Sequence, residues 1–98
     1  MLSEHSPNRL SLLRRQRGLS QKQLAALVGQ ARTIISAYER GHVVPNLAVA
    51  GMFQLFFDVN ISEIFPGLFN DLQRELETNR QRIWALLERT VERIWRTF

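Results

Sequence analysis

Apolar residues recur at helical spacing along most of this chain. The pattern predicts helices over about residues 7–17, 21–28, 30–40, 47–57 and 61–65, and a long final helix over about 68–97. Short segments containing glycine, proline or asparagine separate these helices. We therefore predict an all-α fold. Five short helices form one domain over residues 7–66, and the long amphipathic helix forms a second unit over residues 67–98.

The ends of the first two helices carry specific signals. Ser6 followed by Pro7 is a helix N-cap followed by the residue favoured at the first helical position. Gly18 is expected to end the first helix in the left-handed conformation. Ser20 and Gln23 have the spacing of a capping box, which predicts the start of the second helix.

The later helix ends are marked in similar ways. Asn46 precedes the fourth helix, and Asp58 is expected to end it in the left-handed conformation, which aspartate tolerates better than most residues. Asn60 with Glu63 is expected to cap the fifth helix. The Pro66-Gly67 pair predicts a break before the last helix.

Residues 20–40 contain two helix patterns joined at a glycine, which is typical of a helix-turn-helix DNA reader. Ala25 is small where two helices must cross, and Gly29 can adopt the positive φ of a tight turn. Ile35 is expected to anchor the following helix in the core. The second helix is expected to bury Leu24, Ala25, Leu27 and Val28.

At about 100° per residue, the third helix separates into an apolar side and a polar side. Ile34, Ile35 and Tyr38 fall on the apolar side and are expected to pack inside. The polar side suits a DNA major groove, because arginine can grip guanine with two hydrogen bonds and a threonine or alanine methyl can touch a thymine methyl. The alternative for these side chains is an ordinary solvated helix face. The polar-side candidates are Arg32, Thr33, Ser36, Ala37 and Arg40.

A wider set of residues, from the first helix to the fifth, follows a known pattern. They are Leu10, Leu13, Arg14, Gly18-Leu19-Ser20-Gln21, Leu24-Ala25, Gly29, Ile35-Ser36, Glu39-Arg40-Gly41, Pro45, Leu47, Val59, Glu63 and Phe65. With these residues, the segment 9–65 resembles the phage-repressor and Cro-like helix-turn-helix family, also called the xenobiotic-response-element (XRE) family. The resemblance implies a five-helix, lambda-repressor-like domain that binds palindromic operators as a dimer.

The resemblance also implies roles for individual residues. The implied DNA contacts are Gln21 and Arg40 to phosphates, and Arg32, Thr33 and Ala37 to bases. Arg14 and Glu39 match an internal ion pair that joins the first helix to the third. Glu39 is therefore expected to be structural, and Arg14 is not expected to bind phosphate.

Positive charge is concentrated in the segment that carries this motif. Residues 8–45 hold seven basic side chains and one acidic side chain, a net charge of +6 in a chain whose total is +4. Residues 68–98 are nearly balanced, with six arginines and five acids. A positive field confined to one part of the chain favours a polyanionic partner, and double-stranded DNA is the partner we predict.

The sequence offers few residues for metal binding or catalysis, and no segment for crossing a membrane. Cysteine is absent, and the only histidines, His5 and His42, lie far apart, so we expect neither a metal site nor a cofactor. No nucleophile–base pair or phosphate loop is visible, so we do not expect an enzyme. No apolar run reaches membrane-spanning length and no signal peptide is recognised, which predicts a cytoplasmic protein without membrane association.

The last helix has an apolar stripe that widens after residue 83. Trp84 and Trp95 are eleven residues apart and nearly eclipsed, Asn79 lies close to the stripe, and no internal repeat is recognised. Since a chain of 98 residues has too little body to cover this stripe, we predict a homodimer. The predicted dimer-interface residues are Met52, Leu55, Leu72, Leu76, Ile83, Trp84, Leu87, Val91, Ile94 and Trp95.

Alternatives for the last helix and for the function remain open at this stage. The helix could instead fold back on its own domain, dock a different protein, or, less in keeping with its mixed charges, lie on a membrane. The function we predict is a sequence-specific transcriptional regulator, a repressor that binds a palindromic operator as a homodimer. The alternatives are an antitoxin that binds a toxin through the last helix and represses its own promoter, and an interaction module without DNA.

Overall fold

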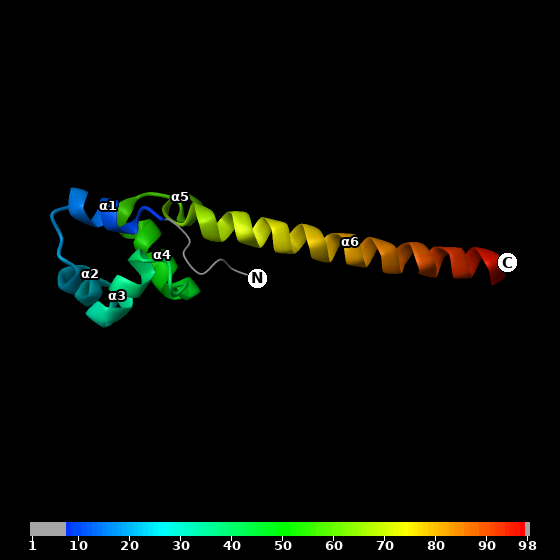
Figure 1. Ribbon diagram of the computed structural model, residues 1–98, viewed down its shortest axis with the longest axis horizontal. Helices are drawn as coiled ribbons and strands as arrows, with labels where there is room; N and C mark the ends of the chain where they lie inside the picture. Colours follow the sequence, from blue (N-terminus) through cyan, green and yellow to red (C-terminus); the bar gives the residue numbers. More distant parts are fainter. Residues whose placement is uncertain (1–7, 98) are drawn as a thin grey trace.

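The computed structural model describes residues 8–97, which form helices and, within that range, no strand (Figure 1). The all-α fold predicted from the helical periodicity is confirmed. The helices are α1 Leu10–Gln16, α2 Gln21–Val28, α3 Arg32–Glu39, α4 Leu47–Phe57, α5 Ile61–Ile64 and α6 Pro66–Thr97.

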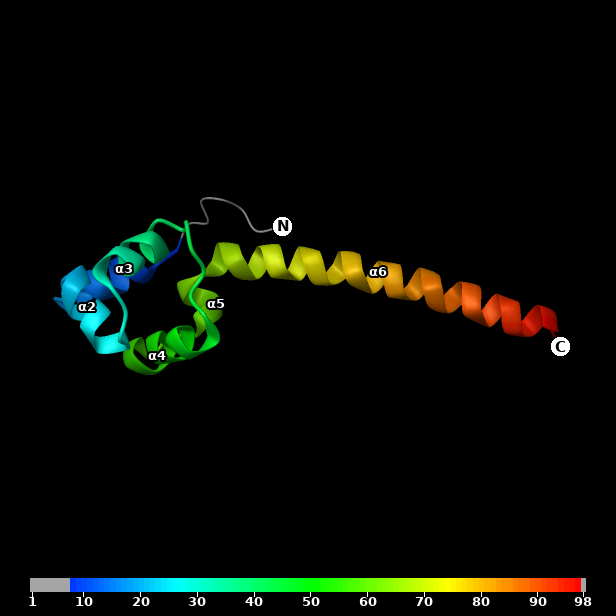
Figure 2. The same ribbon diagram turned by 90° about the horizontal axis from the view of Figure 1, so that it is seen from below.

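Helices α1 to α5 form a small bundle around one core, and α6 leaves this bundle from the side of α5 (Figures 1 and 2). Phe53 of α4 is completely buried at the centre of the aromatic part of the core. Its ring centroid lies 6.1 Å from that of Tyr38 and 6.3 Å from those of Phe57 and Phe65. The other buried apolar side chains of the core cluster are Leu10, Leu24, Ala25, Val28, Ile35, Val49 and Ile64.

Several predicted helix ends are confirmed by their hydrogen bonds. The Ser20 hydroxyl accepts from the Gln23 amide at 3.1 Å, and the Gln23 side chain accepts from the Ser20 amide at 2.8 Å, which completes the capping box. The side chain of Asn46 accepts from the amide of Val49 at 2.9 Å. Asp58 ends α4 with φ 55°, in the left-handed region.

The predicted start of α1 is wrong. The helix begins at Leu10 and not at residue 7, because the Asn8 side chain accepts from the Leu10 amide at 3.1 Å and the Arg9 amide donates to the carbonyl of Ile64 at 2.8 Å. Asn8 thus supplies the local cap, and a contact with α5 fixes the backbone just before the helix. The proposed N-cap Ser6 and the adjacent Pro7 lie outside the described residues.

Two other predicted helix ends also need correction. Asn60 occupies the position before α5, but its side chain makes no capping hydrogen bond, and the Ile61 amide donates instead to the Gln54 side chain at 3.1 Å. The break between α5 and α6 lies at Phe65, with φ −122° and ψ 63°, and not at Pro66-Gly67. These two residues open α6, with proline at the first helical position. Proline fits there because the first amides of a helix have no partner within it.

Leu27 is not buried as predicted, since its side chain is 48% exposed. Leu24, Ala25 and Val28 are buried, which leaves Leu27 on the outer side of α2. Leu27 and Val28 line a shallow cleft of about 290 Å³, and the remaining lining residues are Met52, Leu55 and Phe56 of α4. Some apolar side chains of α4, such as Met52 and Leu55, therefore lie at the surface.

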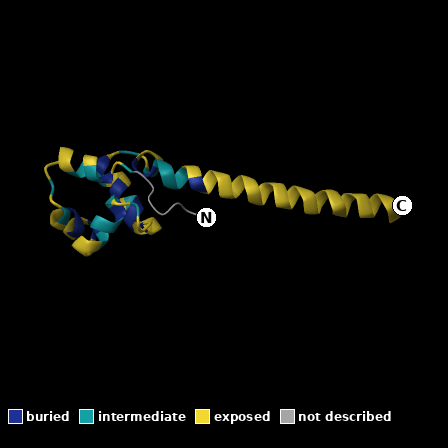
Figure 3. Cartoon of the chain, in the orientation of Figure 1, coloured by how far each residue is buried: buried dark blue, intermediate teal, exposed yellow. Residues whose placement is uncertain are grey.

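Beyond its first turns, α6 projects away from the bundle and gives the molecule dimensions of 68 × 24 × 20 Å. Residues 72–97 are all exposed, as Figure 3 shows along the length of the helix. The alternative in which this helix folds back on its own domain is therefore wrong for this structure. Only the start of α6 joins the bundle: Leu68 packs against the core, and Asp71, a buried carboxylate not singled out from the sequence, pairs with Arg74.

Candidate nucleic-acid interface

The third helix presents its polar side to solvent and its apolar side to the core. Ile35 and Tyr38 are buried, whereas Arg32 and Thr33 are exposed. Ser36 and Ala37 are half-buried at the border between the two sides. The predicted division of this helix into two sides is confirmed, and the exposed side is free to approach a ligand as large as a nucleic acid. Burial also raises the pKa of the Tyr38 phenol, which keeps that side chain neutral inside the core.

The turn between α2 and α3 is closed by a left-handed glycine and a backbone hydrogen bond. Gly29 has φ 67°, and the amide after it, of Gln30, donates to the carbonyl of Ala25 at 2.9 Å. This left-handed end satisfies the last carbonyls of α2 with no penalty from a Cβ atom. Ala25 itself is only 3% exposed, so the small side chain expected where the helices cross is where it was predicted.

The predicted ion pair between Arg14 and Glu39 is formed and joins α1 to α3. Arg14 Nε donates to Glu39 Oε2 at 2.6 Å and Arg14 Nη2 donates to Oε1 at 3.2 Å. The third guanidinium nitrogen, Nη1, donates to the carbonyl of Leu19 at 2.9 Å. The hydrogen bond to Glu39 raises the pKa of Arg14, and the two side chains are only 11% and 7% exposed. A bidentate, largely buried pair of this kind holds α3 in one orientation.

This ion pair continues into a chain of hydrogen bonds that sequence reasoning did not predict. Gln21 Nε2 donates to Glu39 Oε1 at 3.0 Å, and Arg32 Nη1 donates to Gln21 Oε1 at 3.3 Å. Two residues predicted to touch DNA are thus connected to the Arg14–Glu39 brace. Arg32 remains exposed and is held at one nitrogen only, which leaves donors of its guanidinium for a ligand.

Two arginines of the bundle, Arg40 and Arg17, differ in how far their guanidinium groups are available to a ligand. Arg40, at the end of α3, is exposed and its Nε donates to the carbonyl of Ser36 at 3.3 Å. Arg17 instead donates to the carbonyl of Phe57 at 3.1 Å and lies 5.7 Å from the ring centroid of Phe56. Arg17 therefore caps the end of α4, so part of the positive charge counted in the sequence has a structural role.

The predicted dimer-interface residues are all exposed, but they fall on two separate surfaces. Met52 and Leu55 belong to the cleft between α2 and α4. The other eight lie along α6, and we call them the α6 stripe. The α6 stripe consists of Leu72, Leu76, Ile83, Trp84, Leu87, Val91, Ile94 and Trp95, which are between 42% and 74% exposed.

Other kinds of site find no support within residues 8–97. In that range no group of three or more histidines and carboxylates is placed to hold a metal ion. None of the helices in the described part of the chain combines the length and the apolar content needed to cross a bilayer.

Comparison with known protein families gives a match over the bundle. The family described as helix-turn-helix matches residues 10–64, which is more than half of the chain and runs from the first residue of α1 to the last of α5. No curated protein matches the chain.

Proposed function

This chain belongs to the helix-turn-helix family of the Cro-like, XRE type and is a DNA-binding transcription regulator, and we propose that it acts as a repressor on a palindromic operator. We further propose that the bound form is a homodimer. A dimer held on an operator blocks access to promoter DNA that overlaps it, and this is why repression is the direction of regulation that we propose.

The observation that carries this proposal is the exposed polar side of α3, held by the Arg14–Glu39 pair and the turn at Gly29. A helix fixed in this way can enter the major groove, where it reads base edges. Arg32, at the start of α3, is suited to guanine O6 and N7, and the Thr33 methyl is suited to a thymine methyl. Ala37 is small enough to allow close approach one turn later.

Contacts to phosphates would hold the helix in position. Gln21 and Arg40 lie at the start of α2 and at the end of α3, and Arg40 is exposed. Ser36 supplies a hydroxyl at the edge of the same side. Phosphate contacts position a protein without reading sequence, so we assign Gln21, Ser36 and Arg40 to positioning and Arg32, Thr33 and Ala37 to reading.

The homodimer is supported by apolar surface that a single chain leaves uncovered. The α6 stripe is exposed over its whole length, and Met52 and Leu55 add a second apolar surface on the bundle. Contiguous apolar surface of this kind marks an interaction site in a soluble protein. We propose the α6 stripe as the main dimer contact and the α4 surface as a second one.

The test is selection of bound sequences from a random double-stranded DNA pool with the full chain. We expect an inverted repeat whose half-sites lie about 34–36 Å apart, one turn of DNA, because each half-site receives one α3. A reporter whose promoter overlaps the selected sequence should fall in expression when the protein is made. Failure to enrich any sequence would contradict base reading, and a selected site without symmetry would contradict the homodimer.

A further inference from the structure

Asn8 caps two helices at once. Its Oδ1 accepts from the amide of Leu10 at 3.1 Å, at the start of α1, and its Nδ2 donates to the carbonyl of Tyr38 at 2.8 Å, near the end of α3. The first amides and the last carbonyls of a helix have no partner within it, so one short side chain satisfies a group of each kind. Asparagine suits this position because its amide carries both a donor and an acceptor.

The next residue, Arg9, connects the same segment to the base of α6. Its amide donates to the carbonyl of Ile64 at 2.8 Å, and Ile64 is the last residue of α5. The start of α1 therefore lies beside the end of α5, at the point where α6 leaves the bundle (Figures 1 and 2). We call the two bonds, from Asn8 to Tyr38 and from Arg9 to Ile64, the Asn8–Arg9 link.

Phe65, the single residue between α5 and α6, is held on several sides. It is only 5% exposed, and its ring centroid lies 6.3 Å from that of Phe53 in the core. Its amide donates to the carbonyl of Ile61 at 2.8 Å, and its carbonyl accepts from the amide of Phe69, in the first turn of α6, at 3.3 Å. The backbone around Phe65 therefore determines the direction in which α6 leaves the bundle.

Two routes connect α3 to this junction between α5 and α6. One route passes through the core, where the ring of Phe53 packs with the rings of Tyr38 and Phe65. The other route is the Asn8–Arg9 link. Apolar contacts are non-directional, whereas hydrogen bonds depend on angle as well as on distance. The Asn8–Arg9 link is therefore a directional connection between the end of α3 and the base of α6.

We propose that the Asn8–Arg9 link positions α3 relative to α6 and thereby sets which spacing of two half-sites the protein accepts. This inference rests on the homodimer of the proposed function, in which α6 carries the main contact between the copies. When two copies are joined through α6, the separation of their α3 helices depends on the angle between α3 and α6 within each copy. Asn8 and Arg9 are thus positioning residues that act on DNA through α3.

The helical repeat of DNA makes the spacing sensitive to this angle. B-DNA turns once in about 10–10.5 base pairs, so one added base pair rotates the second half-site by about 35° and moves it by about 3.4 Å. A dimer in which the angle between α3 and α6 is fixed can dock both copies on one spacing only. A dimer in which this angle is loose can follow the rotation and accept neighbouring spacings.

Asn8→Asp and Asn8→Ser test the Asn8–Arg9 link without removing the cap of α1. Both new side chains keep an oxygen that can accept from the amide of Leu10, and both are favoured at helix starts. Aspartate has no donor for the Tyr38 carbonyl, and serine, whose side chain is one bond shorter, is expected to keep the cap alone. Asn60→Asp is the matched control, because Asn60 is exposed and makes no capping hydrogen bond before α5.

The measurement uses DNAs that carry the selected half-site as an inverted repeat, with spacers that differ by single base pairs. The wild-type chain and the three variants bind this set in competition, and sequencing of the bound DNA gives the spacing preference. We expect the wild-type chain and Asn60→Asp to favour one spacing. Asn8→Asp and Asn8→Ser should each lose about fivefold of this preference, because the net contribution of one neutral hydrogen bond corresponds to a factor of that order. The half-site motif selected from random DNA should be the same for all four proteins.

The outcomes separate this inference from the proposed function. If either Asn8 variant keeps the wild-type spacing preference, or loses the half-site motif together with that preference, the Asn8–Arg9 link has no separate role in spacing and the inference is overturned. A wild-type chain that selects an inverted repeat without favouring one spacing also overturns it. The proposed function survives each of these results. A wild-type chain that selects no inverted repeat overturns the homodimer and this inference together.

Discussion

The bundle and α6 contain similar apolar side chains and use them differently. Leu24 of α2 is completely buried, whereas Leu76 of α6 is 61% exposed. Five short helices in the bundle cover one another's apolar sides, but the long helix meets its own chain only in its first turns (Figure 3). Helical periodicity therefore identifies the apolar side of a helix but does not reveal what covers that side. In our account the bundle reads DNA, and α6 determines how two bundles are held.

The largest effect that distinguishes the two regions is expected from removal of a carboxylate. Glu39→Ala should lower the free energy of unfolding by about 3–5 kcal/mol, because it leaves the guanidinium of Arg14 buried without its partner. Glu75→Ala, at an exposed site on α6, should change it by less than about 0.5 kcal/mol. Urea denaturation measures both values. Equal changes in the two variants would mean that the brace between α1 and α3 contributes no more than a surface charge.

Alanine substitutions of two leucines, one buried in the bundle and one exposed on α6, should distinguish effects on folding from effects on self-association. Leu24→Ala should lower the free energy of unfolding by about 2–5 kcal/mol at every protein concentration, since it leaves a cavity in the core. Leu76→Ala should have its effect only at concentrations where the protein self-associates, because the single chain leaves this side chain exposed. Thermal unfolding across a concentration series checks both. A concentration-independent loss in Leu76→Ala would contradict the division of roles.

The local features of the bundle could be predicted from the sequence because they depend on neighbouring residues. The capping box of Ser20 and Gln23, the turn at Gly29 and the left-handed Asp58 each need only a few adjacent positions. The start of α1 depends only in part on neighbouring residues, through the bond between Asn8 and Leu10. It also depends on the hydrogen bond from Arg9 to Ile64, which is more than fifty residues away in the sequence and which no local pattern reveals.

The site was predictable in outline but not in its connections. The angular pattern of α3 separates Ile35 from Arg32 correctly, because burial follows the helical period. The hydrogen bonds that place Gln21 between Glu39 and Arg32 require the distance between α2 and α3, which no local pattern gives. The exposure of Leu27 likewise depends on how far α4 extends beside α2.

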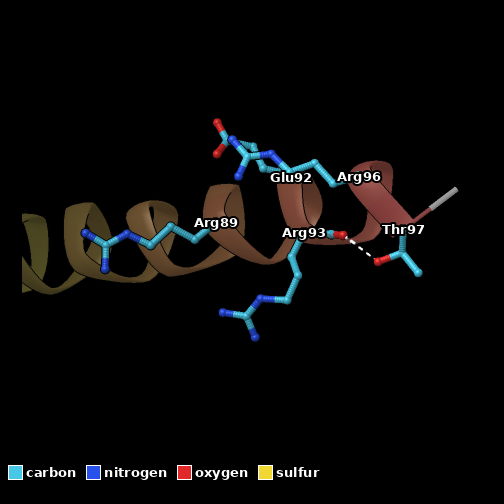
Figure 4. A pocket seen from close by; sticks show the side chains of 5 residues that line it. All are labelled: Arg89, Glu92, Arg93, Arg96 and Thr97. Carbon is cyan, nitrogen blue, oxygen red and sulfur yellow. Dashed lines mark hydrogen bonds between the residues drawn. The ribbon is translucent and has the colours of Figure 1, made fainter.

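If α3 reads DNA sequence through Arg32, removal of this side chain must change the DNA motif that the protein selects. The full chain, Arg32→Ala and Arg89→Ala would each be selected against the same random pool. Arg89 is a matched control, since it is an exposed arginine on the polar side of α6 (Figure 4). We predict that Arg32→Ala loses preference at one base pair in each half-site, at a cost of about 1–3 kcal/mol, while Arg89→Ala keeps the wild-type motif. An unchanged motif for Arg32→Ala would show that this side chain does not read the bases.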